Sequence, residues 1–193
     1  PDLLTELEAQ SGRDLGNWST LWLETAGVNT LRPGCEVDES GAYSSFAIAQ
    51  TAVEEYPTLR PHRIAIGLYS RGVDGALTRV HRVETDVDGA LTQVPELIGI
   101  TRPDLLLLND DDLTYAKIRL DERSLATAIA SLGTLEQSLP RGLVWAAAWD
   151  MARDAEISAA QPDLTEAERS RHLRRPRAGD GFLEQFRRLR VTP

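Results

Sequence analysis

Histidine, cysteine and acidic residues are the side chains of this chain that could bind a metal ion or transfer a proton. The three histidines, His62, His81 and His172, have no second histidine or carboxylate at the spacing of a metal-binding motif, and there is no H-E-x-x-H or C-x-x-C sequence. We expect His62 in a linker, His81 in a strand and His172 in the C-terminal tail. Each is predicted to be a surface or half-buried histidine rather than a ligand.

Three consecutive aspartates, Asp110, Asp111 and Asp112, could supply oxygen ligands to a hard cation. They lack the alternating acidic pattern, the glycine and the distal glutamate of an EF-hand loop. Asn and Asp side chains bond their own backbone and tolerate positive φ, which favours a turn. A solvated turn between strands is therefore the preferred interpretation of this segment.

Hydroxyl and thiol groups complete the set of potential nucleophiles and acids. Ser44 and Ser45 have no base nearby in sequence, and Cys35 lies beside a glutamate that would raise the pKa of its thiol. Tyr115 could act as an acid, but no neighbouring residue supports that role. The chain has no G-x-S-x-G, P-loop or G-x-G-x-x-G motif. We predict no catalytic, substrate-binding or metal-binding residue in it.

Two pairs of tryptophans are spaced four residues apart, Trp18 with Trp22 and Trp145 with Trp149. Residues four apart lie on the same face of a helix. Aromatic pairs at this spacing usually serve the core or a contact between domains, and we expect that role here.

The charge of the chain is unevenly distributed. Its net charge is −9, which makes nucleic acid an unexpected partner, yet residues 162–193 contain eight arginines against five acids. The sole cysteine, Cys35, suits a reducing compartment, and no apolar run approaches the roughly 18 residues of a membrane helix. We expect a cytoplasmic protein without membrane contact. The first residue is not methionine, which permits a start inside a longer protein.

The segment 103–125 marks a change of architecture. Four leucines at 105–108 are too short for a helix and are typical of a strand buried on both faces. After the turn at 109–112, residues 113–120 predict an imperfect second strand. Asp121 then has the position of a helix N-cap, and helical spacing begins at Leu125.

The other elements follow from spacing and turn residues. One helix is predicted to begin at Leu3 and end at Gly12, and a second is predicted to begin at Asp14 and end at Gly27. Asp-Gly and Ser-Gly turns separate strands at intervals of 8–12 residues, which is typical of a small antiparallel sandwich, and Asp88-Gly89 predicts a type I′ hairpin turn. The predicted strands are 30–37, 43–50, 63–70, 76–87 and 90–94, and later helices cover 125–132 and 141–157. The fold class is α+β: short N-terminal helices, an antiparallel β-sandwich, then α-helices.

Longer stretches of the chain resemble one family. WSTLWLETAGVNTLRP at 18–33, RPDLLLLNDDDLTYAKIRLDERSLATAIASLG at 102–133 and SLPRGLVWAAAWDMARDAE at 138–156 are similar to the M1 family of zinc metallopeptidases, which includes bacterial aminopeptidases. The resemblance covers roughly residues 1–156. It implies that the chain contains the last helices of a peptidase domain (1–30), a β-sandwich (31–120) and the start of a helical domain (121–158). The Arg-rich tail, 159–193, departs from the family, and we expect it to be disordered.

The family's catalytic motifs are missing from this sequence. The resemblance implies a zinc ion held by an H-E-x-x-H helix and a downstream glutamate, with a G-x-M-E-N strand that binds the substrate amine, and neither motif occurs here. No functional residue can be carried over. We expect a segment without zinc of its own, inactive alone, that supports the peptidase and helical domains of a parent enzyme. The parent would remove N-terminal residues from peptides.

Two other expectations remain open. The abrupt change after Glu156 is typical of a frameshifted or truncated gene, although a genuine alternative C-terminus would look similar. The chain could instead be a stand-alone β-sandwich adaptor that binds another protein through exposed apolar faces. On either interpretation, the expected partner is the remainder of an aminopeptidase or another protein, and peptides bind only through a parent.

Overall fold

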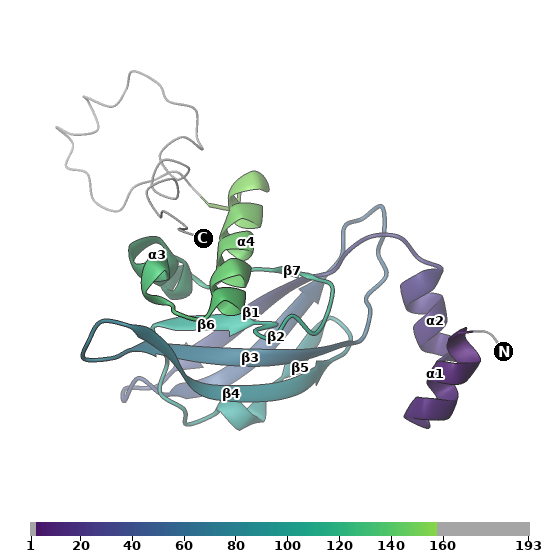
Figure 1. Ribbon diagram of the computed structural model, residues 1–193, viewed down its shortest axis with the longest axis horizontal. Coiled ribbons are helices and arrows are strands. Elements are labelled where there is room, and N and C mark those ends of the chain that lie inside the picture. Colours follow the sequence, from purple (N-terminus) through teal and green to yellow (C-terminus); the bar gives the residue numbers. More distant parts are fainter. Residues whose placement is uncertain (1–2, 158–193) are drawn as a thin grey trace, which may run out of the picture.

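The computed structural model describes residues 3–157. The chain begins with two short helices, α1 (Leu3–Ser11) and α2 (Gly16–Leu23), as the leucine spacing predicts. Gly12 ends α1 with a φ of 66°, a left-handed conformation that glycine adopts at little cost. Figure 1 shows both helices set to one side of the sheets, at the end of the molecule where the chain enters the sandwich.

Two β-sheets follow. One contains four strands in the order β5-β2-β1-β7, and the other contains three in the order β4-β3-β6. The strand pairs are antiparallel except for β1 with β7, which is parallel. The bounds are β1 Thr30–Val37, β2 Tyr43–Thr51, β3 His62–Arg71, β4 Leu77–Val87, β5 Leu91–Gln93, β6 Leu105–Leu108 and β7 Lys117–Ile118. The predicted α+β class with a mainly antiparallel sandwich is confirmed.

The first hydrophobic core lies between the two sheets. It takes alternate residues from each strand, because successive side chains of a strand point to opposite faces. Leu31 of β1 and Phe46 of β2 meet Ile66 of β3 in this layer, and all three are fully buried or nearly so. A short 3₁₀ helix, η1 (Pro95–Leu97), closes one end with Leu97.

Strand β6 is buried on both faces, as its four consecutive leucines predict. Leu106 and Leu108 belong to the core between the sheets, whereas Leu105 and Leu107 belong to a second core beneath the helices. That second core contains residues of α3 (Glu122–Ser131), η2 (Leu132–Thr134) and α4 (Ser138–Arg153). In Figure 1, α3 and α4 lie against the β6 side of the sheet. Asp121 caps α3 as predicted, since its carboxylate accepts a hydrogen bond from the Ser124 amide at 2.8 Å.

Two strand predictions are wrong in detail. Only Lys117–Ile118 of the expected strand at 113–120 forms β7. The preceding loop is folded around Asn109, whose side-chain oxygen accepts from the amides of Leu113 and Thr114 and whose amide donates to the Thr114 carbonyl. The Asp88-Gly89 turn is also not a hairpin, because β5 pairs with β2 of the other sheet instead of β4.

No helix within residues 3–157 is long and apolar enough to cross a membrane. The prediction that the Arg-rich tail is disordered concerns residues that lie outside those the structure describes.

Candidate interdomain contacts

Arg60 joins the N-terminal helices to the sandwich. Its side chain donates from Nε to the Leu21 carbonyl at 2.8 Å, and from one Nη to the carbonyls of Thr25 and Ala26 at 3.0 and 2.9 Å. The guanidinium also lies 5.6 Å from the centre of the Trp22 ring. A cation beside the last carbonyls of a helix interacts favourably with the helix dipole. Arg60 therefore fixes the end of α2 against the sandwich.

His62 lies beside this junction and corrects the prediction of a surface or half-buried histidine in a linker. It is the first residue of β3 and is only 3% exposed. One ring nitrogen bonds the Thr114 hydroxyl at 2.8 Å, the other faces the Asn29 side-chain oxygen at 3.2 Å, and the Trp22 ring packs edge-on at 5.3 Å. Burial, with a smaller contribution from the Arg60 charge, lowers the pKa of His62 to about 4. It is a neutral core histidine at pH 7.

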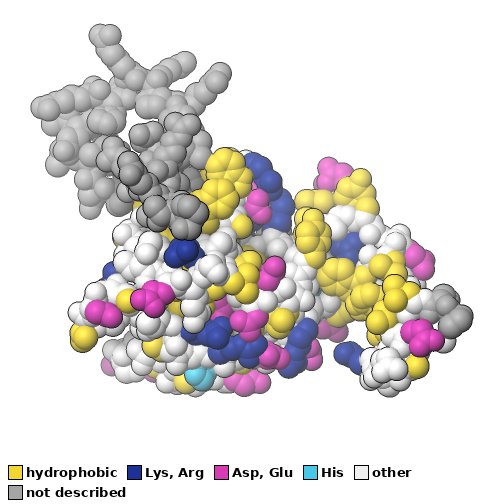
Figure 2. Space-filling view, viewed as in Figure 1, with side chains coloured by type: hydrophobic (Ala, Val, Ile, Leu, Met, Phe, Trp, Pro, Cys, Tyr) yellow, Lys and Arg dark blue, Asp and Glu magenta, His cyan; other side chains and the backbone are white. Residues whose placement is uncertain are grey.

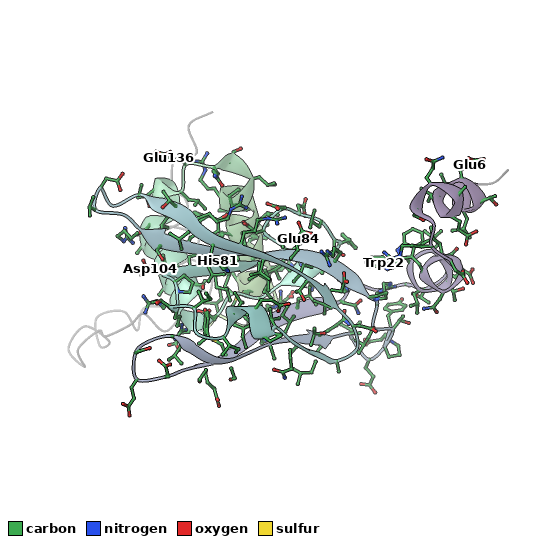
Figure 3. The ribbon with its side chains drawn as sticks, turned by 90° about the horizontal axis from the view of Figure 1, so that it is seen from below. Glu6, Trp22, His81, Glu84, Asp104 and Glu136 are labelled. Carbon is green, nitrogen blue, oxygen red and sulfur yellow. The ribbon has the colours of Figure 1, made fainter. Side chains whose placement is uncertain are left out.

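Figure 3 shows Trp22 on the side of α2 that faces the sandwich. The predicted packing role of Trp22 is therefore confirmed at this junction. Trp18, one turn earlier, is 37% exposed.

Polar contacts reinforce the second junction, between β6 and α3. The Ser124 hydroxyl accepts from the Leu106 amide at 2.8 Å, and the Thr127 hydroxyl donates to the Asp104 carbonyl at 2.7 Å. The Asp104 carboxylate accepts from the Arg71 amide at 2.8 Å and from the Arg123 guanidinium at 2.9 Å. These bonds satisfy the outer edge of a strand that would otherwise carry unpaired polar groups in a core.

Asp110 is buried, with 1% of its surface exposed, which corrects the prediction of a solvated turn. One carboxylate oxygen accepts from the Tyr69 hydroxyl at 2.5 Å and the other accepts from Arg79 at 2.7 Å. Burial, helped by the bond to this carboxylate, raises the pKa of Tyr69, so the phenol remains a proton donor. Gly67 leaves room for the group, since a Cβ there would lie under 3.0 Å from Asp110 and Tyr69 atoms.

The other two aspartates have separate environments. Asp111 pairs with Arg79 and Arg82, and although burial opposes it, these bonds lower the pKa of its carboxyl. Asp112 has a φ of 55° and lies at a small pocket between this turn and α4. Arginine side chains pair with the carboxylates of Asp110 and Asp111.

The predicted nucleophiles and acids are dispersed. Ser45 donates to Glu36 at 3.2 Å, which is a cross-strand contact, and Tyr115 is exposed in the loop before β7. Burial raises the pKa of the Cys35 thiol, so the direction predicted from the neighbouring glutamate holds for a different reason. His81 lies on β4, and His172 falls outside the described residues. Within residues 3–157 the structure brings none of these groups together.

Exposed apolar side chains gather in two places on the face shown in Figure 2, over α1 and α2 and on α4. Neither α1 nor α2 has a buried residue, and Leu23 is 68% exposed. On α4, Trp145 and Trp149 stack on each other with centroids 5.7 Å apart. They remain 41% and 39% exposed, so their outer faces are not covered by the described chain.

The described residues do not fit the zinc ion that the M1 resemblance implies. Within residues 3–157 there is no group of three His, Cys, Asp or Glu that could hold a metal ion. His62 and His81, the two histidines in this range, lie on different strands and have the separate surroundings given above. No step of a reaction is therefore assigned to this part of the chain.

Three arginines make distant contacts that the sequence pattern does not indicate. Arg60, Arg79 and Arg119 each bond groups that are at least 31 positions away in sequence. Local spacing contains no signal for such pairs.

Comparisons with known proteins give a family model, a curated relative and a solved structure. A family model described as the ERAP1-like C-terminal domain matches residues 105–168, from β6 onwards. Aminopeptidase N of Streptomyces lividans is 59% identical over 163 residues, which is 81% of this chain and 19% of the relative. A crystal structure of Legionella pneumophila aminopeptidase A in complex with aspartic acid matches 98% of this chain and 27% of that chain, at 14% identity and a TM-score of 0.43.

The chain spans about a fifth of the length of the curated relative that it matches. The sequence match carries the assignment, because 59% identity extends over most of the chain and includes both the sandwich and the helices that follow it. These two sequence matches support the assignment of the chain as a fragment of an M1 aminopeptidase.

Proposed function

We propose that this chain is a non-catalytic segment of an M1 aminopeptidase that supports the peptidase domain and seats the helical domain. In this proposal residues 1–30 end the peptidase domain, residues 31–120 form the β-sandwich and residues 121–158 begin the helical domain. The parent enzyme would release N-terminal residues from peptides with a zinc-bound water, in the cytoplasm. The zinc, the catalytic residues and the peptide site would all belong to the remainder of the enzyme.

The observation that carries this proposal is the 59% identity to aminopeptidase N over 81% of the chain. The distribution of apolar surface supports it. Helices α1 and α2 have no buried residue of their own, although α2 contains two tryptophans and two leucines in eight positions. An amphipathic helix normally buries its apolar face. A partner that covers this face is what a peptidase domain would provide.

The first experiment asks whether the 193-residue chain has activity of its own. We expect no bound zinc by elemental analysis and no hydrolysis of aminoacyl anilides. Hydrolysis that a chelator abolishes would contradict the non-catalytic role.

The second experiment asks whether α1 and α2 recognise a peptidase domain. The chain would be co-expressed with the Streptomyces lividans enzyme from which the matching segment and everything after it are deleted. We expect the two polypeptides to co-purify, and Leu23→Ser with Trp18→Ser to weaken the association at least tenfold. Leu91→Ser, at an exposed leucine of β5, is the matched control and should leave the association unchanged.

The adaptor alternative predicts a different outcome. A self-sufficient module would be monomeric in size-exclusion chromatography, would melt cooperatively and would not bind the truncated peptidase. The exposed Trp145–Trp149 pair is the feature that favours a protein partner of another kind. Association with the peptidase, together with aggregation of the isolated chain, would reject the adaptor.

A further inference from the structure

The last turn of α4 ends against basic side chains of the sandwich. Arg119, directly after β7, donates from Nε to Glu156 at 2.7 Å and from Nη to Asp154 at 2.6 Å. Lys117 of β7 donates to Asp154 at 2.8 Å, and Arg32 of β1 pairs with Glu156. Three cations from the sandwich thus meet two carboxylates that follow one helix. Positive charge at this end also complements the helix dipole.

Arg119 is the centre of this group. Its side chain is 3% exposed, whereas the other four members are between 25% and 50% exposed. Exposed ion pairs add little to stability, but a buried guanidinium is costly unless it is paired. The backbone directly after β7 holds Arg119 in place, since the Arg119 amide donates to the Leu31 carbonyl at 2.9 Å. The short strand β7 therefore places a buried cation, Arg119, next to the end of α4.

Ala155, between the two carboxylates, has an unfavourable backbone conformation. Its φ is 58°, and the amides of Ala155 and Glu156 donate back to the carbonyls of Ala152 and Met151 at 3.2 and 2.9 Å. Glycine is the usual residue at such a left-handed helix end, because the Cβ of alanine makes this backbone conformation less favourable. The residues on either side of Ala155 are the two that Arg119 binds. The ion pairs can therefore hold a turn that the local sequence disfavours.

We propose that Arg119, Lys117 and Arg32 form a positioning clamp that fixes the direction in which the chain leaves α4. The sandwich, rather than α4 itself, then sets the conformation of the turn at residues 154–156. This inference extends the proposed function, in which the sandwich seats the start of the helical domain. The clamp itself is a property of this chain and does not need the parent enzyme.

Hydrogen–deuterium exchange of the full 193-residue chain, read by NMR, tests the clamp. In Arg119→Met we expect the amides of Ala155 and Glu156 to exchange about tenfold faster, because their turn loses its counter-ions. Amides of α4 from Val144 to Ala148 should change less than about twofold. Arg153→Met is the matched control: Arg153 pairs with Asp150 and Asp154 but bonds no sandwich residue, and its loss should leave Ala155 unchanged.

Two further variants separate positioning from packing. Ala155→Gly added to Arg119→Met should restore slow exchange at Glu156 to within about threefold of the original chain, because glycine adopts positive φ without strain. The double variant Asp154→Asn with Glu156→Gln removes the carboxylates that Arg119 binds. It should therefore produce the same faster exchange as Arg119→Met. A glycine rescue is not expected if Arg119 only fills space in the core.

The clamp is wrong if Arg119→Met changes exchange at Ala155 and Glu156 by less than about twofold. It is also wrong if exchange rises equally throughout α4 and β1, or if glycine restores nothing. None of these readouts uses peptidase binding or activity. Failure of the clamp therefore leaves the supporting role intact, and failure of peptidase association leaves the clamp intact.

Discussion

Strand β6 and helix α2 each join one part of the molecule to another, but they do so by different means. Every side chain of β6 is buried, with two leucines in each of two hydrophobic cores. Helix α2 has no buried residue, and Arg60 and His62 attach its end through hydrogen bonds and ring contacts. The free energy gained by burying apolar area is large and non-directional. A few hydrogen bonds, in contrast, fix the orientation of a helix while burying little area.

The difference indicates which parts of the chain can fold together. The sandwich, α3 and α4 share β6, so loss of one core exposes the face of a strand that belongs to the other. The α1–α2 region shares no core with them. It is held in position while most of its apolar surface stays available to a partner.

The largest effect is expected from the strand common to both cores. Leu107→Ala removes a side chain that is 1% exposed in the core beneath the helices, and should lower the free energy of unfolding by about 2–5 kcal/mol. Leu23→Ala, on exposed α2, should change it by less than about 0.5 kcal/mol. Urea unfolding followed by fluorescence measures both. Equal effects would mean that α2 has a core of its own.

The pH dependence of the free energy of unfolding should report on the burial of His62 at the α2 junction. The pKa of His62 is about 4 in the folded chain, against roughly 6.5 unfolded. Above pH 6.5 both states are neutral; as the pH falls towards 4, only the unfolded state gains the proton. The free energy of unfolding should therefore decrease by up to roughly 3 kcal/mol across this window.

Urea unfolding at pH 7, 6 and 5 measures this slope. His62→Gln should flatten it, and His81→Gln tests whether loss of any histidine would do the same. An unchanged slope in His62→Gln would place the pH dependence elsewhere.

A matched pair of glycines tests the buried Asp110 group. In Gly67→Ala the new methyl group would meet Asp110 and Tyr69 atoms, and we expect a destabilisation of about 1–3 kcal/mol. Gly142→Ala places the same methyl in open space on α4, where it should stabilise by about 0.5–1 kcal/mol. Thermal unfolding compares the two. A neutral Gly67→Ala would show that the Asp110 carboxylate can move without cost.

Only a small effect on the stability of the sandwich is expected from breaking the α2 attachment. Arg60→Met removes the bonds to Leu21, Thr25 and Ala26, yet we expect the sandwich to lose less than about 1 kcal/mol. Limited proteolysis should instead cut faster within residues 24–29. Arg13→Met, an exposed arginine between the two helices, is the control. Global unfolding of Arg60→Met would contradict the separation of the two regions.

Local patterns in the sequence were sufficient for most elements. The leucine run predicted a strand with two buried faces because four apolar residues cannot make a helical face. Asp121 predicted the start of α3 because its carboxylate can cap an exposed amide. The tail prediction and the division into domains remain predictions, as does the absence of catalytic residues.

The sequence by itself determined the order of helices and strands and the strand-to-helix change at Asp121, and the resemblance of its longer stretches indicated the family. Only the tertiary structure decided that β5 crosses to the other sheet, that residues 113–116 form a loop and that His62 and Asp110 are buried. It also decided which arginine meets which acid. The physical reason is that turns and periodicity act over a few residues, whereas charge pairing and burial depend on groups brought together from 31 or more positions apart.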